Sequence, residues 1–261
     1  MEITLDTFVK ISGKAGNAAR NDNMRSALEG LKLMGFAAGL QRPHRLAMFL
    51  AQTAQESGGW YYDREVWGPT AAQKTYEGRK NLGNTQPGDG SLFRGYTPMQ
   101  ITGRANTTKF YNWCRYNVDP NCPDFTKEPH KMNTDPWEGL GPIWYWTQGK
   151  PYSLNTQADR GDFVGVTKSI NGGTNGLNER YRYYGRAAMV LLGFDPNNPK
   201  AYQLARKLKN DGIIGPATQQ ALHKDLSLLP DVTFGPKNII NQQVNILDSI
   251  LKFLAKLFGA K

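Results

Sequence analysis

The stretch PHRLAMFLAQTAQESGG, residues 43–59, decides the fold of this chain. Its leading proline suits the first position of a helix, where no backbone N–H is needed. Apolar side chains then recur with helical spacing at Leu46, Phe49 and Leu50. The pattern runs without glycine or proline to Glu56, and a pair of glycines shortly afterwards provides a stop. We expect a helix that packs one apolar face into a core.

Similar helical patterns recur through the first 195 residues, whereas few segments alternate polar and apolar residues as strands do. We expect further helices at residues 4–11, 18–34, 102–116, 163–170 and 177–192, and one that begins at Asp135. Residues 60–70 are typical of a loop or short hairpin, and residues 81–90 of a loop. The sequence therefore predicts a mainly α-helical protein.

Composition excludes several classes of protein. The chain has 261 residues, of which 39% are hydrophobic and 11% aromatic, so it can bury a core and is not disordered throughout. No apolar run approaches the roughly 20 residues that span a bilayer. The first six residues, MEITLD, lack the basic and apolar regions of a secretory signal peptide, and we expect none.

The charge points to a polyanionic partner. The 32 Lys and Arg outnumber the 22 Asp and Glu, which gives a net charge of +10. Nucleic acid, an anionic membrane and a bacterial cell wall would all attract such a protein, although the charge could also serve solubility alone. No nucleic-acid-binding motif is present, so we expect no nucleic-acid partner.

Cysteine and histidine offer little to a metal. The two cysteines, Cys114 and Cys122, exclude a disulfide-dense scaffold and leave either one bridge or two free thiols open. The histidines are His44, His130 and His223, which are scattered, and no HExxH motif occurs. We therefore expect neither a metal nor another cofactor.

The composition changes near residues 195–199, which read DPNNP and resemble a linker. We expect one domain over residues 1–199 and a small helical region over residues 200–261. A pattern D-x-x-[IF]-G-P occurs twice in that region, at residues 211–216 and 231–236. The chain closes with an amphipathic segment that spans residues 247–258.

Glu56 is the first candidate for chemistry, because it ends a helix whose other face is apolar. Burial and the negative end of the helix dipole would both raise its pKa and keep the carboxyl group neutral. A neutral carboxyl can protonate a leaving oxygen. The glycines that follow, and then Trp60, would offer open backbone and a flat wall to a sugar ring. The plain alternative is a solvated glutamate at a helix end.

A second carboxylate would complete the minimal equipment for glycoside hydrolysis. The nearby candidates are Asp63, Glu65, Glu77 and Asp89, and spacing alone does not choose among them. Three polar residues, Gln100, Thr102 and Asn106, precede or open the next helix. There the hydroxyl of Thr102 either caps that helix or holds a water molecule.

Five segments in order resemble glycoside hydrolase family 19, in its bacterial and phage lysozyme branch. They are AQESGGW (54–60), EVWGPTA (65–71), RGYTPMQITGRAN (94–106), IWYW (143–146) and INGGTNGL (170–177), the last followed by Glu179 and Arg180. The chain departs from the family pattern at Gln55, where the family has His, and at Tyr96 and Thr97, which we expect to border the cleft.

The resemblance implies a lysozyme-like, two-lobed helical domain with a central cleft and an inverting mechanism. Glu56 would be the general acid, Glu65 the general base and Thr102 a holder of the attacking water. Substrate would be bound by Trp60, Gln100, Asn106, Asn171 and Arg180, of which the last four would line the sugar subsites or orient the carboxylates.

The C-terminal region carries a weaker resemblance. Residues 211–222, DGIIGPATQQAL, resemble a motif of small helical peptidoglycan-binding domains. The amphipathic segment after it would either dock on this region or touch an anionic outer-membrane or lipid surface.

These features favour a phage endolysin that acts as a monomeric muramidase. Such an enzyme would accumulate in the host cytoplasm, reach the wall at lysis, and cut the β-1,4 bonds of peptidoglycan. Three alternatives stay open: a chitinase, a wall- or membrane-binding protein without catalysis, and a lytic transglycosylase.

Overall fold

The computed structural model describes residues 1–14, 16–150 and 152–235. This part of the chain is mainly helical, which confirms the expected fold class. Its α-helices are α1 (Leu5–Ser12), α2 (Ala18–Met34), α3 (Pro43–Glu56), α4 (Ala71–Lys74), α5 (Asp89–Leu92), α6 (Arg104–Asn117), α7 (Trp137–Gln148), α8 (Asn155–Asp159), α9 (Phe163–Asn171), α10 (Leu177–Leu191), α11 (Pro199–Ala205) and α12 (Pro216–Leu228). Two short 3₁₀ helices are η1 (Lys80–Leu82) and η2 (Pro129–Asn133).

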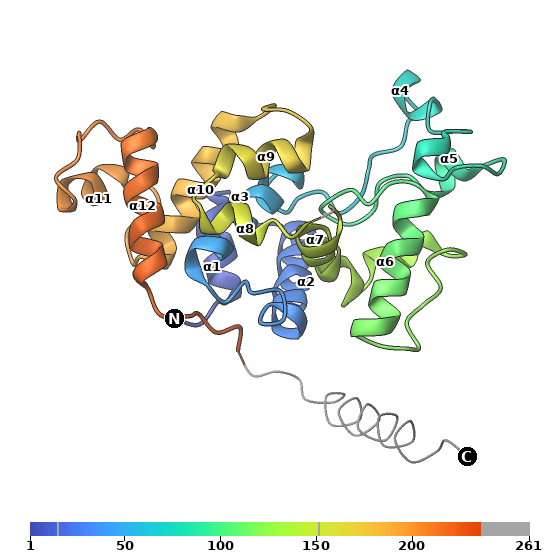
Figure 1. The fold of residues 1–261 in the computed structure, drawn as a ribbon, viewed down its shortest axis with the longest axis horizontal. Coiled ribbons are helices and arrows are strands. Elements are labelled where there is room, and N and C mark those ends of the chain that lie inside the picture. Colours follow the sequence, from blue (N-terminus) through green and yellow to red (C-terminus); the bar gives the residue numbers. More distant parts are fainter. Residues whose placement is uncertain (15, 151, 236–261) are drawn as a thin grey trace, which may run out of the picture.

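Helix α3 is the centre of the larger lobe and begins and ends where the sequence predicts. It packs against α8, α10 and α12 (Figure 1). The sequence predicted one apolar face, but α3 is buried nearly all round, polar Gln52 and Thr53 included. The reason is that α10 packs along α3. Gln52 bonds the side chains of Thr167 and Arg180, and the hydroxyl of Thr53 donates to the carbonyl of Phe49 at 3.0 Å.

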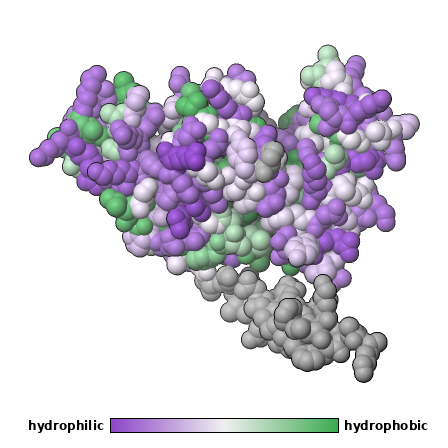
Figure 2. Space-filling view, in the orientation of Figure 1, coloured by the Kyte–Doolittle hydropathy of each residue, from purple (hydrophilic) through white to green (hydrophobic). Residues whose placement is uncertain are grey.

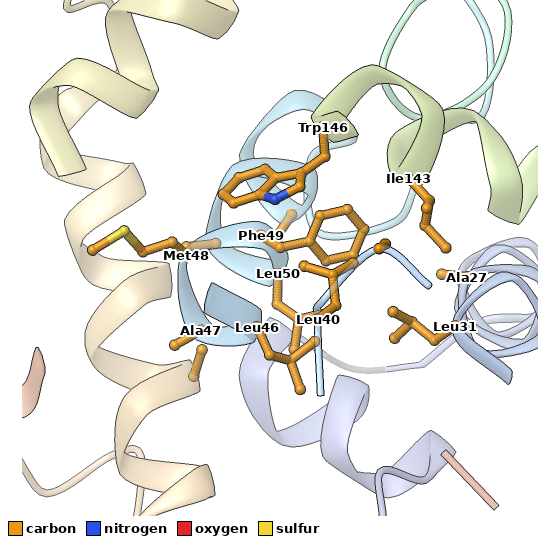
Figure 3. Close-up of a cluster of buried hydrophobic side chains, with 14 of the residues drawn as sticks. Ala27, Leu31, Leu40, Leu46, Ala47, Met48, Phe49, Leu50, Ile143 and Trp146 are labelled. Carbon is orange, nitrogen blue, oxygen red and sulfur yellow. The ribbon is translucent and has the colours of Figure 1, made fainter. Parts of the chain in front are cut away.

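The core gathers around the apolar residues of α3. Figure 3 shows Trp146 of α7 beside Phe49, and their rings meet edge to face with centroids 5.6 Å apart. Leu31 of α2 and Ile143 of α7 reach the same cluster, and both are buried. Each such side chain contributes about 1.5–3 kcal/mol by leaving water. The core therefore joins α2, α3 and α7.

Helix α7 crosses α2 so closely that glycine is required at the crossing. A Cβ on Gly139 of α7 would lie 1.8 Å from the carbonyl oxygen of Ser26. A Cβ on Gly30 of α2 would lie 2.3 Å from the carbonyl oxygen of Gly139. These contacts lock α7 onto α2, and α7 also packs against η2 and α6 of the second lobe.

The second lobe carries α4, α5 and α6 and stands apart as an arm in Figure 1. Its core is aromatic: Phe110 of α6 stacks on Phe125 with ring centroids 5.6 Å apart. Trp144 of α7 lies 5.5 Å from Phe110, centroid to centroid. Helix α7 therefore contributes to the cores of both lobes and fixes one against the other.

The region after residue 199 packs onto the larger lobe wherever it is described. Leu222 and Leu226 of α12 are buried, and Phe234 packs edge to face on Phe36 at 5.5 Å. A domain boundary near residue 199 stays a prediction. The amphipathic segment expected at residues 247–258 lies outside the described residues.

Both cysteines are free thiols. Cys114 and Cys122 are buried, and burial raises the pKa of Cys122 to about 11 and that of Cys114 well above its usual range. They stay protonated at neutral pH and behave as core residues. Over the ranges that the structure describes, none of the helices combines the length and apolarity needed to span a membrane.

Candidate active site

Glu56 lies at the C-terminal end of α3, where Arg180 of α10 meets it. One Nη of Arg180 bonds Oε1 of Glu56, and the other bonds Oε1 of Gln52, one turn earlier on α3. Gln52 in turn donates to the hydroxyl of Thr167 at 2.9 Å. The side chain of Arg180 is only 3% exposed, against 23% for Glu56. Arg180 is therefore a fixed, buried cation, whereas Glu56 reaches toward the surface.

The sequence named Arg180 as a site residue, and the structure shows its guanidinium bonded directly to the carboxyl group of Glu56. Within the described part of the chain, no hydrogen bond reaches Oε2 of Glu56, so one oxygen stays available.

The turn after α9 belongs to the same group. The Nδ2 of Asn171 and the Nε of Arg180 both donate to the carbonyl of Asn175, each at 3.4 Å. The amide of Gln55 lies against Gly176, where a Cβ would come within 2.8 Å of its nitrogen. The structure thus brings Glu56, Asn171 and Arg180 together, as the sequence predicted for one site.

Glu65 lies in a second group, on the arm. Its Oε1 accepts from Nε2 of Gln73 at 3.0 Å and from the hydroxyl of Tyr76 at 3.3 Å. Its Oε2 accepts from the backbone N–H of Gly95 at 3.0 Å. Burial and the charge of Glu65 raise the pKa of Tyr76, so this hydroxyl stays a donor. Three donors therefore hold both oxygens of Glu65 in place.

The sequence argument missed Gln73 and Tyr76. The Oε1 of Gln73 accepts from the backbone N–H of Gly68 at 3.1 Å and of Thr70 at 2.7 Å. Because that oxygen is occupied, the amide nitrogen must point at Glu65. A signal was present, since Thr70 and Gln73 have the spacing of a capping box at the start of a short helix.

Backbone pairing places Glu65 and Thr102 on two segments that flank the same central segment, which carries Gly95 and Tyr96. Tyr96 pairs antiparallel with Ile101 on one side and with Arg64 on the other. The residues next to these pairs also match up. Glu65 donates its N–H to the carbonyl of Gly95 at 2.8 Å. On the other side, the pairing of Tyr96 with Ile101 puts Gly95 opposite Thr102. Glu65 and Thr102 therefore lie on the same side of this three-segment turn.

The hydroxyl of Thr102 does not cap the following helix. It donates to the carbonyl of Gln100 at 3.0 Å, and Gly103 is the N-cap of α6. Of the two roles left open by the sequence, helix capping is therefore wrong. The donated proton leaves the oxygen lone pairs of Thr102 available to a water molecule.

Gln100 and Asn106 support the same turn. The Oε1 of Gln100 lies over Gly95, where a Cβ would come within 2.2 Å of it. Asn106 donates from Nδ2 to the carbonyl of Thr102 at 3.0 Å. Both side chains are half-buried, and they lie within the Glu65 group rather than beside Glu56.

The two groups lie on different lobes, Glu56 at the end of α3 and Glu65 on the arm. Residues 57–64 are the chain that joins them. Figure 2 shows the surface hollowed between the block that carries α9 and the arm that carries α4 and α5. The lobes meet the expectation of a two-lobed helical protein, with one carboxylate group on each.

Three expected cleft residues are buried instead. Trp60 was predicted to offer a sugar ring its flat face, but it is 0% exposed and packs edge to face on Phe8 at 5.2 Å. The turn after α3 explains this. Ser57 Oγ accepts a hydrogen bond from the backbone N–H of Trp60, and the resulting turn directs the ring inward. Tyr96 and Thr97 are also buried, so neither borders the cleft.

The described residues form no cluster of metal ligands. In the ranges that the structure describes, no three side chains among His, Cys, Asp and Glu come together as a metal site would require. What the arrangement offers is two carboxyl groups in different hydrogen-bonding surroundings across a groove, which is equipment for acid–base chemistry on a glycosidic bond.

Comparison with known proteins agrees with this chemistry. The chain is 32% identical over 180 residues to a glycosyl hydrolase family 19 domain-containing protein of Haemophilus influenzae, which covers 59% of this chain and 82% of that relative. The chain matches no protein-family profile.

Solved structures of chitinases share the fold. Chitinase C from Streptomyces griseus superposes with a TM-score of 0.55 at 19% identity, over 74% of this chain and 78% of that chain. A family 19, class IV chitinase from Zea mays gives 0.52 at 19% identity, over 74% and 94%. At such identities the likeness concerns the fold, and the family follows from the sequence relative: the chain belongs to glycoside hydrolase family 19 and is a glycoside hydrolase.

Proposed function

We propose that the protein is a muramidase: it hydrolyses the β-1,4 bonds of peptidoglycan that follow N-acetylmuramic acid, with inversion, with Glu56 as general acid and Glu65 as general base. The observation that carries the assignment is the contrast between the two carboxyl groups. Glu65 accepts three hydrogen bonds, whereas Oε2 of Glu56 accepts none from the described residues. An oxygen without a donor is the one that can carry a proton to the leaving group.

Arg180 sets the conditions under which Glu56 acts. As general acid, Glu56 would give a proton to the leaving oxygen while Arg180 bonds its Oε1. Gln52 would hold Arg180 in place during this transfer.

Glu65 would take a proton from a water on the opposite face of the sugar. Gln73, Tyr76 and Gly95 fix both of its oxygens, and Thr102 lies on the same side of the turn. The hydroxyl of Thr102 would accept a hydrogen bond from this water. Inversion needs carboxyl groups about 6.5–9.5 Å apart, which leaves room for it.

The remaining polar residues would bind the glycan. Asn171 and Arg180 lie beside Glu56, and Gln100 and Asn106 lie beside Glu65, so sugars on both sides of the cleaved bond would meet amide groups. N-acetyl groups of the substrate offer both an N–H and a carbonyl to such partners.

Charge favours peptidoglycan over chitin as substrate. Peptidoglycan and its surroundings carry carboxylates and phosphates, which attract a protein of net charge +10. Chitin is neutral, so the positive charge would not attract the protein to it. A monomeric phage endolysin, held in the host cytoplasm until lysis, fits such an enzyme. The region after residue 199 would then add affinity for the wall or for an anionic lipid surface.

Product analysis tests the proposal. Purified peptidoglycan is digested, and the reducing ends of the fragments are identified by mass spectrometry. Reducing N-acetylmuramic acid supports it, as does its loss in the Glu56→Gln variant. Reducing N-acetylglucosamine, anhydro ends, or cleavage of chitin oligomers with an intact wall would each contradict it. Removing a general acid costs about 10²- to 10⁴-fold in rate.

A further inference from the structure

The backbone between Glu56 and Glu65 accepts hydrogen bonds from side chains of α2, in the larger lobe, and of η2. Asn23 of α2 donates to the carbonyl oxygens of Trp60 at 3.0 Å and of Tyr61 at 3.3 Å. Asn133, the last residue of η2, donates to the carbonyl of Asp63 at 2.6 Å. Side-chain hydrogen bonds therefore fix the backbone of residues 60–63.

Asn133 links both backbone segments that position Glu65. Besides holding Asp63, its Oδ1 accepts from the N–H of Thr97 at 3.1 Å. Asp63 lies two residues before Glu65, and Thr97 lies two residues after Gly95, which bonds the Glu65 carboxylate. A shift at the junction of η2 and α7 would thus move Glu65.

Glu138 lies at that junction, in the first turn of α7. It is 6% exposed, and its Oε1 has no hydrogen-bond partner among the described residues. Helix α7 cannot move to give this oxygen a partner, because Gly139 packs directly against α2. Gly141 is equally close to Thr97, since a Cβ there would come within 2.4 Å of the threonine hydroxyl. A buried carboxyl group with an unpaired oxygen calls for an explanation.

The charges that face Glu138 are mainly negative. Asp63 of the connecting chain, Asp135 before α7 and Asp22 of α2 oppose its ionisation, and Arg64 favours it. Burial, followed by the charge of Asp63, raises the pKa of Glu138 to about 8. At neutral pH the group is therefore protonated and does not repel Asp63.

Ionisation would disturb the chain before Glu65. Arg64 is paired with its neighbour, Nη2 to Oδ2 of Asp63 at 2.6 Å, on the exposed side of the segment. A charged Glu138 would repel Asp63 and attract Arg64, which pulls this pair apart. Because Arg64 also pairs with Tyr96 through the backbone, the change would reach the turn that holds Glu65.

We propose that Glu138 is a positioning residue that must be protonated to hold residues 60–65, and hence Glu65, in the geometry for catalysis. This inference rests on the proposed function of Glu65. It adds a residue remote from substrate whose ionisation contributes to the loss of activity at alkaline pH. It also makes α7, the helix shared by both lobes, the element that responds to pH.

The test compares the wild type with Glu138→Gln, which mimics the protonated side chain and cannot ionise. As the pH rises through about 8, kcat of the wild type should fall more steeply than kcat of Glu138→Gln, and the two should match at pH 6. Glu29→Gln, a partly exposed glutamate paired with Lys32 on α2, is the matched control and should follow the wild type. Equal alkaline limits in Glu138→Gln and wild type would overturn the inference.

Thermal unfolding supplies a readout that needs no substrate. Between the ordinary glutamate pKa of 4.5 and about 8, the unfolded chain loses a proton that the folded chain keeps, so stability falls as pH rises. Glu138→Gln should therefore match the wild-type Tm near pH 4 and exceed it increasingly up to pH 8. A constant difference would overturn the inference. Absence of hydrolysis with this Tm pattern intact would instead refute the proposed function alone.

Discussion

Arg180 bonds Glu56 and Gln52 at once, so one buried guanidinium spans two successive turns of α3. The first turn of α10 is thereby tied to the end of α3 that carries the proposed acid. A guanidinium suits this task because its donors form a rigid, planar fork. Glu56 is held in position by a partner that is itself held by Gln52.

Replacing Arg180 by Lys should therefore impair catalysis although the charge is kept. A single ammonium cannot reproduce the fork between Glu56 and Gln52. We expect kcat to fall about 10- to 100-fold, equal to about 1.4–2.7 kcal/mol of transition-state stabilisation. Arg182→Lys is the control, since Arg182 is partly exposed and paired with Glu179. Equal kcat values for the two variants in steady-state assays would contradict the role of Arg180.

Gln73→Glu tests the surroundings of Glu65. The new side chain keeps an oxygen for the N–H groups of Gly68 and Thr70, but it replaces a donor to Glu65 with a second carboxylate. Like charges at this distance favour a shared proton, and a protonated Glu65 cannot act as a base. We expect kcat at pH 7 to drop about tenfold or more, a cost of at least about 1.4 kcal/mol.

The control for that variant is Gln86→Glu, because Gln86 bonds Arg104 on the arm and lies outside the Glu65 group. It should retain wild-type kcat. Should Gln73→Glu remain as active as Gln86→Glu across the pH range, Gln73 has no part in setting the charge of Glu65.

Trp60→Phe distinguishes a core residue from a sugar platform. Trp60 is fully buried against Phe8, so the smaller ring leaves a cavity and should lower the free energy of unfolding by about 1–3 kcal/mol. KM for a soluble glycan should not change. Denaturant unfolding and steady-state kinetics check both points, and a raised KM with unchanged stability would restore the platform role.

Asp159 gives stability a measurable pH dependence. It accepts from Arg45 at 2.5 and 2.7 Å and pairs with His44 at 2.9 Å. The pKa of Asp159 is lowered to about 2, chiefly by Arg45 and against the effect of burial. Its stabilising effect is complete above the ordinary value of 3.8 and is lost as pH falls through about 2.

Asp159→Asn should therefore lower Tm by a few degrees at pH 7, and the difference should shrink below pH 4. Asp6→Asn removes a surface pair with Lys10 and serves as control, with little effect at either pH. A deficit in Asp159→Asn that is the same at pH 7 and pH 3 would show that its ion pairs do not carry the effect.

Local signals made the long helices predictable from sequence. Helix α3 begins at Pro43 and ends at Glu56 as expected, because proline and glycine act within a few residues and need no tertiary partner. The expected residues Glu56, Asn171 and Arg180 lie in one group, and Glu65 and Thr102 in another. The short helices α4, α5 and α8 escaped prediction since one turn shows too little periodicity.

The sequence predictions were wrong or incomplete where contacts between distant chain segments determine whether a side chain is buried. Trp60 follows two glycines in sequence, but Phe8 and Ser57 turn it into the core. Glu138 received no role from the sequence, and its burial follows from the packing of α7 on α2. Such burial depends on crossings between elements that no local pattern encodes.

The anomeric form of the first product tests the central claim most directly. A β-1,4-linked N-acetylglucosamine oligomer or a peptidoglycan glycan strand is digested, and the new reducing end is followed by NMR before mutarotation. If Glu56 protonates the leaving oxygen while Glu65 activates a water opposite, the α-anomer must appear first. Initial release of the β-anomer would mean retention, and the paired roles of Glu56 and Glu65 would be wrong.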